Sequence, residues 1–191
     1  MGAMGCTLEE AQNFANAYAS GFPGIAKFKS EGSKFVRKNG YILMCKYSGH
    51  KMYWWDHDKW LERQKSFTQD FWEDYRKNHK GTGDDIALMV SKHFKAASKW
   101  DRMALNSPTQ GSGIVILKIA ISNFFDWIVK NHLFGKVELS ALVHDEANII
   151  YPSELSEVST TLKRFMEEAA ALVCTKLPIP AEAEVASFWK H

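Results

Sequence analysis

The 191 residues are enough for one large domain or two small ones, and 46% of them are apolar, which can fill a hydrophobic core. Seven Trp and twelve Phe make that core unusually aromatic. The net charge is only +2, but residues 25–54 contain seven Lys or Arg and one Glu, whereas residues 137–185 contain nine Asp or Glu and three Lys or Arg. A basic surface for a polyanion beside an acidic surface for metal ions would explain this distribution, and two solvated faces are the alternative.

The cysteine pattern excludes several classes of protein. Cys6, Cys45 and Cys174 are odd in number and widely spaced, which fits neither a disulfide framework nor a zinc site. We therefore expect a reducing, cytoplasmic location. No uninterrupted apolar run reaches the roughly 20 residues of a membrane helix and no signal peptide opens the chain, so no membrane partner is expected. Residues 1–3 resemble an expression scar, which leaves residues 4–191 for the fold.

The first two predicted elements are helices. Thr7 and Glu10 form the pattern of a capping box, in which the Thr hydroxyl accepts an amide hydrogen bond and the Glu carboxylate reaches back. The first helix is interrupted at Gly21-Phe22-Pro23-Gly24, and the second ends at Asn39-Gly40. Apolar residues recur at helical spacing in both, and those expected to face a core are Leu8, Ala11, Phe14, Ala15, Tyr18, Ile25, Phe28, Phe35 and Val36.

The middle of the chain predicts a β-hairpin followed by two helices. Two short strands that flank a Ser-Gly turn predict the hairpin over residues 41–54. An aromatic helix is expected over residues 58–78, and Asp84 or Asp85 is expected to cap a helix that continues through Phe94. The aromatic stripe of the first of these helices should pack into the core, and a contact with DNA or a protein partner is the alternative. Its members are Trp60, Phe67, Phe71 and Tyr75.

Another helix and a second hairpin are predicted in the next segment. Apolar residues recur at core spacing over residues 109–130, after a bend or restart near Pro108 and Gly111. Residues 137–143 alternate between apolar and polar, and a second strand over residues 147–151 follows almost at once.

The last predicted helix begins at Ser153 and is stopped by Pro178 and Pro180, before an extended segment over residues 181–189. The predicted fold class is α+β: mainly helical, with a small antiparallel sheet.

The sequence His144-Asp145-Glu146 falls in or beside the turn of the second hairpin. Adjacent carboxylates on a rigid turn can hold Mg²⁺, which prefers a few carboxylates together with substrate phosphates. The alternative is a solvated acidic turn without a ligand.

Arg102, Asn106 and Gln110 are spaced by four residues, so they would share one face of a helix. Their donor groups suit the minor-groove acceptors of DNA, which are nearly the same for every base pair. Such a row could hold a duplex without reading its sequence, and an ordinary polar helix face is the alternative.

These segments together resemble family A DNA polymerases, the DNA polymerase I type. The resemblance covers Gly5–His191 except for an apparent insertion at about residues 55–95. The motifs that carry it are Asp101-Arg102, Asn106-Ser107-Pro108-Thr109-Gln110-Gly111, Ile116-Leu117-Lys118 and Val143-His144-Asp145-Glu146, in that order. Weaker matches are Glu10-Ala11, Tyr18, Phe22-Pro23-Gly24, Gly40-Tyr41 and a closing strand from Leu177-Pro178-Ile179-Pro180 through Glu184-Val185 to Trp189.

The resemblance implies a role for each candidate residue. Asp145 would be the second of the carboxylates that bind two catalytic Mg²⁺ ions, with Glu146 beside it and His144 near the primer terminus. Arg102, Asn106 and Gln110 would contact the minor groove of the primer–template. The second hairpin would then be a metal-binding hairpin and part of a polymerase palm.

Three departures from the family's pattern are visible. Asp101 stands where Glu is usual, Leu142 where Gln is usual, and Val115 where Asp is common. Such departures are more typical of phage or prophage enzymes than of the main bacterial repair polymerase, so a bacterial or phage-infected cell is the expected setting.

Two further parts that the resemblance implies do not occur in this sequence. They are the first metal-binding Asp, in an Asp-Tyr-Ser-like strand, and the nucleotide-binding helix with its Lys and Tyr. We therefore expect a C-terminal, fingers-proximal fragment of a DNA-directed DNA polymerase, inactive alone, whose partners are primer–template DNA, deoxynucleoside triphosphates and the rest of the polymerase chain. The alternatives are a non-catalytic nucleic-acid-binding or partner module that retains the fold, and a purely structural fragment.

Overall fold

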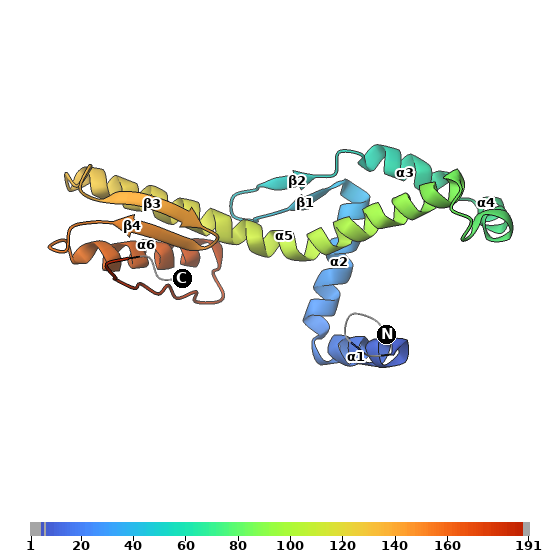
Figure 1. The fold of residues 1–191 in the computed structure, drawn as a ribbon, viewed down its shortest axis with the longest axis horizontal. Coiled ribbons are helices and arrows are strands. Elements are labelled where there is room, and N and C mark those ends of the chain that lie inside the picture. The colour runs from blue at the N-terminus through green and yellow to red at the C-terminus, as the bar shows by residue number, and fades with distance from the viewer. Residues whose placement is uncertain (1–4, 6, 189–191) are drawn as a thin grey trace. The chain divides into compact units, whose positions relative to one another are not determined.

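The computed structural model describes residues 5 and 7–188, which form a mostly helical protein with two small antiparallel sheets (Figure 1). The predicted α+β class is confirmed, although each of the two hairpins forms a separate sheet. The chain divides into two compact units. The first contains the described residues up to Ile42 together with Lys51–Ser107, and the second contains Leu43–His50 and the described residues from Pro108 onward.

Helices α1 (Leu8–Gly21) and α2 (Pro23–Asn39) begin and end as predicted. The capping box is present: the Thr7 hydroxyl accepts a hydrogen bond from the Glu10 amide at 3.2 Å, and the Glu10 carboxylate accepts one from the Thr7 amide at 2.7 Å. Pro occupies the first turn of α2, where a missing amide costs nothing.

The apolar faces of α1 and α2 are mostly exposed. Within the described residues no side chain of α1 is buried, and in α2 only Val36 is buried. The prediction that both stripes face a core is therefore wrong for most of their members, because helical spacing creates a face that another element must still cover. The exposed members are Leu8, Phe14, Ala15, Tyr18, Ile25, Phe28 and Phe35.

The predicted first hairpin is confirmed, with shorter strands. It consists of β1 (Tyr41–Leu43) and β2 (Lys51–Tyr53). The amide of Trp54 donates to the carbonyl of Gly40 at 2.7 Å, which closes the base of the hairpin.

Trp54 lies at the centre of the core of the first unit. Its ring stacks on Trp100 at 5.3 Å between centroids and packs against Trp60 at 5.0 Å. Gly40 ends α2 with a φ of 69°, and a Cβ there would lie 2.5 Å from Nδ1 of His57, so only Gly allows this turn. The buried members of this core are Val36, Ile42, Trp54, Trp60, Ala97, Trp100 and Ala104.

The predicted single helix over residues 58–78 is interrupted. The backbone at Thr68 is extended, and its Oγ1 accepts a hydrogen bond from the Phe71 amide at 3.2 Å, so Thr68 caps a new helix. The prediction of one helix is wrong, because apolar spacing continues through a break that a side-chain cap creates. The observed segments are α3 (His57–Ser66), α4 (Gln69–Asp74) and the π-helix η1 (Tyr75–His79).

The aromatic stripe of this region packs into a core around His93. Trp60 and Phe67 are buried, as predicted, and the two later members of the stripe are half-buried. The ring of His93 stacks on Trp60 at 4.8 Å and meets Phe67 edge-on. Burial lowers the pKa of His93, so this imidazole is neutral at neutral pH.

His79 links the end of η1 to the start of the next helix. Its Nδ1 lies 2.7 Å from the Asp84 carboxylate and its Nε2 lies 3.2 Å from the Asp74 carboxylate. The hydrogen bond to Asp84 is the main cause of a raised pKa at His79, and the same bond lowers the pKa of Asp84 to about 2.

NMR titration of His79 is expected to give a pKa above its ordinary value of 6.5. Because the folded pKa is raised, the protonated imidazole stabilises the fold below pH 6.5, and this contribution is lost as the pH rises through the raised pKa. Asp84→Asn keeps an oxygen for helix capping but removes the charge, so it should lower the pKa of His79. Asp85→Asn is the matched control, and an unchanged titration in Asp84→Asn would contradict the assignment.

Helix α5 (Asp85–Lys130) is continuous where the sequence predicted two helices. Oδ1 of Asp84 accepts a hydrogen bond from the Ala87 amide at 2.8 Å, which confirms the predicted cap. Pro108 lies inside the helix, so of the two predicted alternatives, a bend or a restart, the restart is wrong. Pro removes one backbone hydrogen bond, but its fixed φ is helical, and buried side chains hold α5 on both sides of it.

Within the described residues, α5 is also the one helix long and apolar enough to cross a membrane, judged by length and composition alone. Such a helix is weak evidence when it stands alone, because a core helix of a soluble protein passes the same test. No uninterrupted apolar run in α5 is long enough to span a membrane, but its mean hydropathy over a window of apolar and polar residues is high.

The predicted second hairpin is confirmed as β3 (Glu138–Val143) and β4 (Glu146–Ile150) in the second unit. The pairing shifts by one residue between Leu139 and Ala141, which is a β-bulge. Val137, just before β3, is buried, whereas Leu139 is 45% exposed, so the predicted alternation of burial does not hold at the start of the strand.

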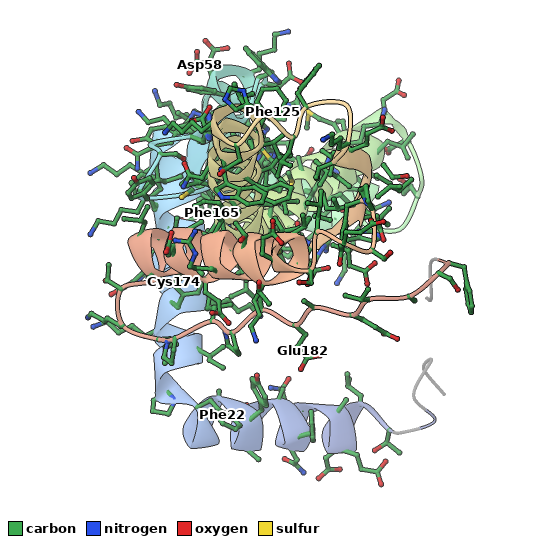
Figure 2. The ribbon with its side chains drawn as sticks, turned by 90° about the vertical axis from the view of Figure 1, so that its left-hand side faces the viewer. Phe22, Asp58, Phe125, Phe165, Cys174 and Glu182 are labelled. Carbon is green, nitrogen blue, oxygen red and sulfur yellow. The ribbon has the colours of Figure 1, made fainter. Side chains whose placement is uncertain are left out.

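Helix α6 (Glu157–Val173) covers this hairpin and completes the second core. Ser156 occupies its N-cap position without a side-chain hydrogen bond, so the predicted cap at Ser153 is wrong. Figure 2 shows Phe165 on α6, Cys174 just past its end and Glu182 in the segment that follows. The buried residues of this core are Phe124, Ile128, Val137, Val158 and Leu162.

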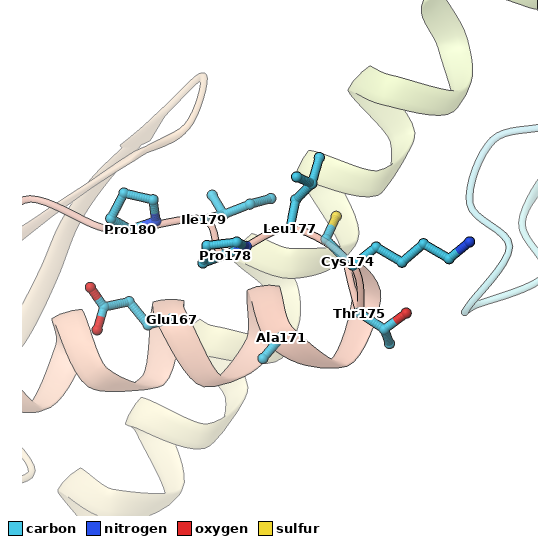
Figure 3. Close-up of a pocket in the computed structure, with 9 residues that line it drawn as sticks. Glu167, Ala171, Cys174, Thr175, Leu177, Pro178, Ile179 and Pro180 are labelled. Atoms are coloured by element: carbon cyan, nitrogen blue, oxygen red, sulfur yellow. The ribbon is translucent and has the colours of Figure 1, made fainter. Parts of the chain in front are cut away.

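The segment after α6 folds back along the helix. Figure 3 shows residues 177–180 beside Ala171 and Glu167, around a pocket. The Glu167 carboxylate accepts a hydrogen bond from the Ala181 amide at 3.1 Å. Up to residue 188 this segment forms no strand, so the predicted closing strand is wrong for the described residues, and Trp189 lies outside them.

Two further sequence-based expectations concern this end of the chain and the cysteines. Helix α6 ends at Val173, well before Pro178, so the prolines follow the end of the helix and do not cause it. Cys45 and Cys174 are free thiols, and Cys6 lies outside the described residues.

Candidate metal turn and nucleic-acid-binding helix

The turn of the β3–β4 hairpin consists of His144 and Asp145. Val143 pairs with Glu146, so two residues connect the strands. His144 has a φ of 55°, and a positive φ at the first central position is typical of tight hairpin turns. His144, Asp145 and Glu146 are all exposed. The sequence therefore predicted the place of these residues correctly, at the tip of a rigid hairpin.

The chemistry of this turn fits part of a magnesium site. Carboxylate oxygens are the ligands that Mg²⁺ prefers, and a typical site uses one or two of them with waters and phosphates. The exposed Asp145 and Glu146 offer such oxygens to solvent. In the part of the chain that the structure describes, no group of three or more His, Cys, Asp or Glu side chains is placed to hold a metal ion. The turn thus has the ligand type of a magnesium site but not a full ligand set.

The polar residues predicted to face DNA are on α5. Arg102, Asn106 and Gln110 are exposed, and each follows the previous one by four residues along the continuous helix. Arg102 and Asn106 belong to the first unit and Gln110 to the second. Nη1 of Arg102 donates to the Ser98 hydroxyl at 3.1 Å, one turn earlier, so its guanidinium is held along the helix surface.

Asp101, beside this row, pairs with a residue of another helix, which the sequence does not predict. Nε of Arg37 donates to Oδ1 of Asp101 at 3.0 Å, and Nη2 of Arg37 donates to Oδ2. This two-point pairing ties α2 to α5. No local pattern could have identified it, because 64 residues separate the two side chains.

Gly111 follows the row on α5, and the backbone of Met44 packs closely against it. A Cβ at this position would lie 2.6 Å from the carbonyl oxygen and 2.7 Å from Cβ of Met44. Since backbone atoms cannot yield, only Gly fits here. In this Gln-Gly pair, Gln110 is exposed to solvent, and Gly111 packs too closely against Met44 to carry a side chain.

The chain belongs to DNA polymerase family A, whose sequence profile matches residues 2–191. Its curated relatives include the DNA polymerase I of Caldicellulosiruptor bescii, 28% identical over 182 residues that make up 95% of this chain and 17% of the relative. The DNA polymerase I of Borreliella burgdorferi is 29% identical over 97% of this chain and 16% of its own length. That of Bacillus subtilis is 24% identical over 96% of this chain and 16% of its own length.

The chain therefore spans about one sixth of the length of these curated relatives. The predicted resemblance to family A polymerases is confirmed. The predicted phage-like origin stays a prediction, and so do the individual site residues and the insertion at residues 55–95.

Proposed function

We propose that this chain is the C-terminal part of the polymerase domain of a template-directed DNA polymerase, phage-like in type and acting in the bacterial cytoplasm. The observation that carries the proposal is the hairpin turn with Asp145 and Glu146 exposed at its tip, in a chain whose family is established. The turn supplies one of two carboxylate groups that the chemistry needs, and the rest of the polymerase supplies the other.

The metal chemistry assigns the roles at the turn. Mg²⁺ bound there would stabilise negative charge on the attacking and leaving oxygens of nucleotidyl transfer. Asp145 and Glu146 would hold the metal ion, and His144 would lie near the primer terminus. The nucleotide-binding helix, which positions the deoxynucleoside triphosphate, belongs to the rest of the polymerase chain.

In this proposal the exposed row on α5 binds the primer–template duplex. Arg102, Asn106 and Gln110 donate hydrogen bonds to minor-groove acceptors of the primer–template, whose pattern hardly depends on sequence. The row therefore checks the shape of the duplex next to the new base pair. The pairing of Arg37 with Asp101 supports it by fixing the neighbouring residue on α5.

A second function is a nucleic-acid-binding module without catalysis. The observation that favours it is the exposed row of Arg102, Asn106 and Gln110 on α5, which could contact nucleic acid without a metal ion. The two functions differ in one respect that can be measured: only the first requires Asp145 for primer extension.

Duplex binding by this chain is expected to be weak, independent of sequence and strongly salt-dependent. Phosphate contacts release counterions, so affinity should fall steeply between about 50 and 200 mM salt. Arg102→Ala should lower the affinity by roughly tenfold, since a hydrogen bond from a charged donor contributes about 1.5 kcal/mol. Fluorescence anisotropy with a labelled blunt duplex measures both effects.

Arg164→Ala is the matched control, because Arg164 is exposed on α6 and paired with Glu168 at 3.2 Å. It should bind the duplex as the unmodified chain does. A salt-independent isotherm, or equal losses in the two variants, would contradict the role of the α5 row.

A further inference from the structure

The β1–β2 hairpin has two faces of unequal character. Ile42 and Trp54 are buried and Met52 packs against them, so one face belongs to the core. Successive residues of a strand point to opposite faces, which places Lys51 and Tyr53 on the outer face. A sheet with one solvated face normally has polar residues there. This hairpin instead exposes aromatic rings.

Four aromatic side chains form a continuous outer aromatic row: Phe35, Tyr41, Tyr53 and Trp55. The centroid distances along the row are 5.2 Å from Phe35 to Tyr41, 6.0 Å from Tyr41 to Tyr53 and 6.1 Å from Tyr53 to Trp55. Phe35 is 42% exposed, Tyr53 51% and Trp55 90%. Contiguous apolar surface of this kind on a soluble unit marks a binding surface.

The charge around the row is positive. Nζ of Lys51 lies over the Tyr41 ring, 4.6 Å from its centroid, and Lys38 is exposed one helical turn after Phe35. In residues 25–54 the single acidic side chain, Glu31, lies 3.8 Å from Nζ of Lys27. A ligand that fits this surface therefore has flat apolar groups, which can stack on the rings, and negatively charged groups, which can contact the lysines.

We propose that the outer aromatic row binds single-stranded DNA by stacking of unpaired bases on its rings. Aromatic side chains beside a positive surface are the combination by which proteins hold single strands without sequence preference. A duplex is disfavoured, because its bases are already stacked on one another. The site rests on the proposed function, in which it would hold template that has not yet been copied.

The test measures binding of a labelled oligothymidine and of a blunt duplex to this chain by fluorescence anisotropy. Tyr53→Ala combined with Trp55→Ala should weaken binding of the single strand by roughly tenfold or more, since each stacked base contributes about 1–3 kcal/mol. Duplex affinity should change by less than about twofold. Trp55→Phe should retain most of the single-strand affinity, because a ring remains.

Phe14→Ala is the matched control, since Phe14 is 69% exposed on α1 outside the basic segment. It should leave single-strand binding unchanged. The inference is overturned if the double variant binds the single strand as well as the unmodified chain does, or if the unmodified chain does not bind it. If the unmodified chain binds the single strand but does not bind the duplex, the proposed function is contradicted, whereas the proposed stacking site is supported.

Discussion

Replacing Asp145 by Asn is expected to lower primer extension by roughly a thousandfold in a polymerase assembled from this chain and the rest of its polymerase domain, a loss of about 4 kcal/mol. Asn has the shape of Asp but lacks its charge, so it cannot replace a carboxylate that binds Mg²⁺. The affinity for primer–template should stay within about twofold, because Asp145 is placed at a hairpin tip and contributes no positive charge to the contact.

Primer extension under single-turnover conditions measures this effect. Glu154→Gln is the matched control, since Glu154 is also an exposed acid of the second unit and should leave extension unchanged. This chain alone should extend no primer. Extension by the chain alone, or undiminished extension by the Asp145→Asn enzyme, would place the chemistry elsewhere.

Trp54→Ala is expected to lower the free energy of unfolding of the first unit by about 3–5 kcal/mol, the usual cost of removing a large buried aromatic ring. Trp54 is only 7% exposed and packs against both Trp60 and Trp100, so its loss leaves a cavity between two other large rings. Urea unfolding followed by far-UV circular dichroism measures the change.

The adjacent Trp55→Ala is the matched control for this prediction. Trp55 is 90% exposed, so its removal should change the unfolding free energy by no more than about 0.5 kcal/mol. Equal destabilisation by the two substitutions would mean that Trp54 is not the centre of the core.

The features that the sequence predicted well are those set by neighbouring residues. The capping box of Thr7 and Glu10, the cap at Asp84 and the end of α2 at Gly40 each depend on the residues at a few neighbouring positions. The turn at His144 and Asp145 was predictable for the same reason, because two strand-like segments leave almost no residues between them. Local chemistry thus located the tip that carries the candidate metal ligands.

The features that the sequence predicted poorly depend on distant packing. Pro108 normally interrupts a helix, yet α5 continues through it because buried side chains hold both flanking turns. The stripe of α1 is helical but exposed, since its spacing says nothing about what covers it. The pairing of Arg37 with Asp101 and the close approach of Gly111 to Met44 likewise join distant segments.

For the packing of the hairpin at the candidate metal site, the number of residues in the turn between β3 and β4 matters more than their identity. A substitution at His144 changes one side chain, but inserting or deleting a single residue there would move every following side chain of β4 to the opposite face. Ala147 and Ile149, which pack against the second core, would then point to solvent. Variation of the tip in natural or engineered sequences should therefore exchange residues and conserve their number.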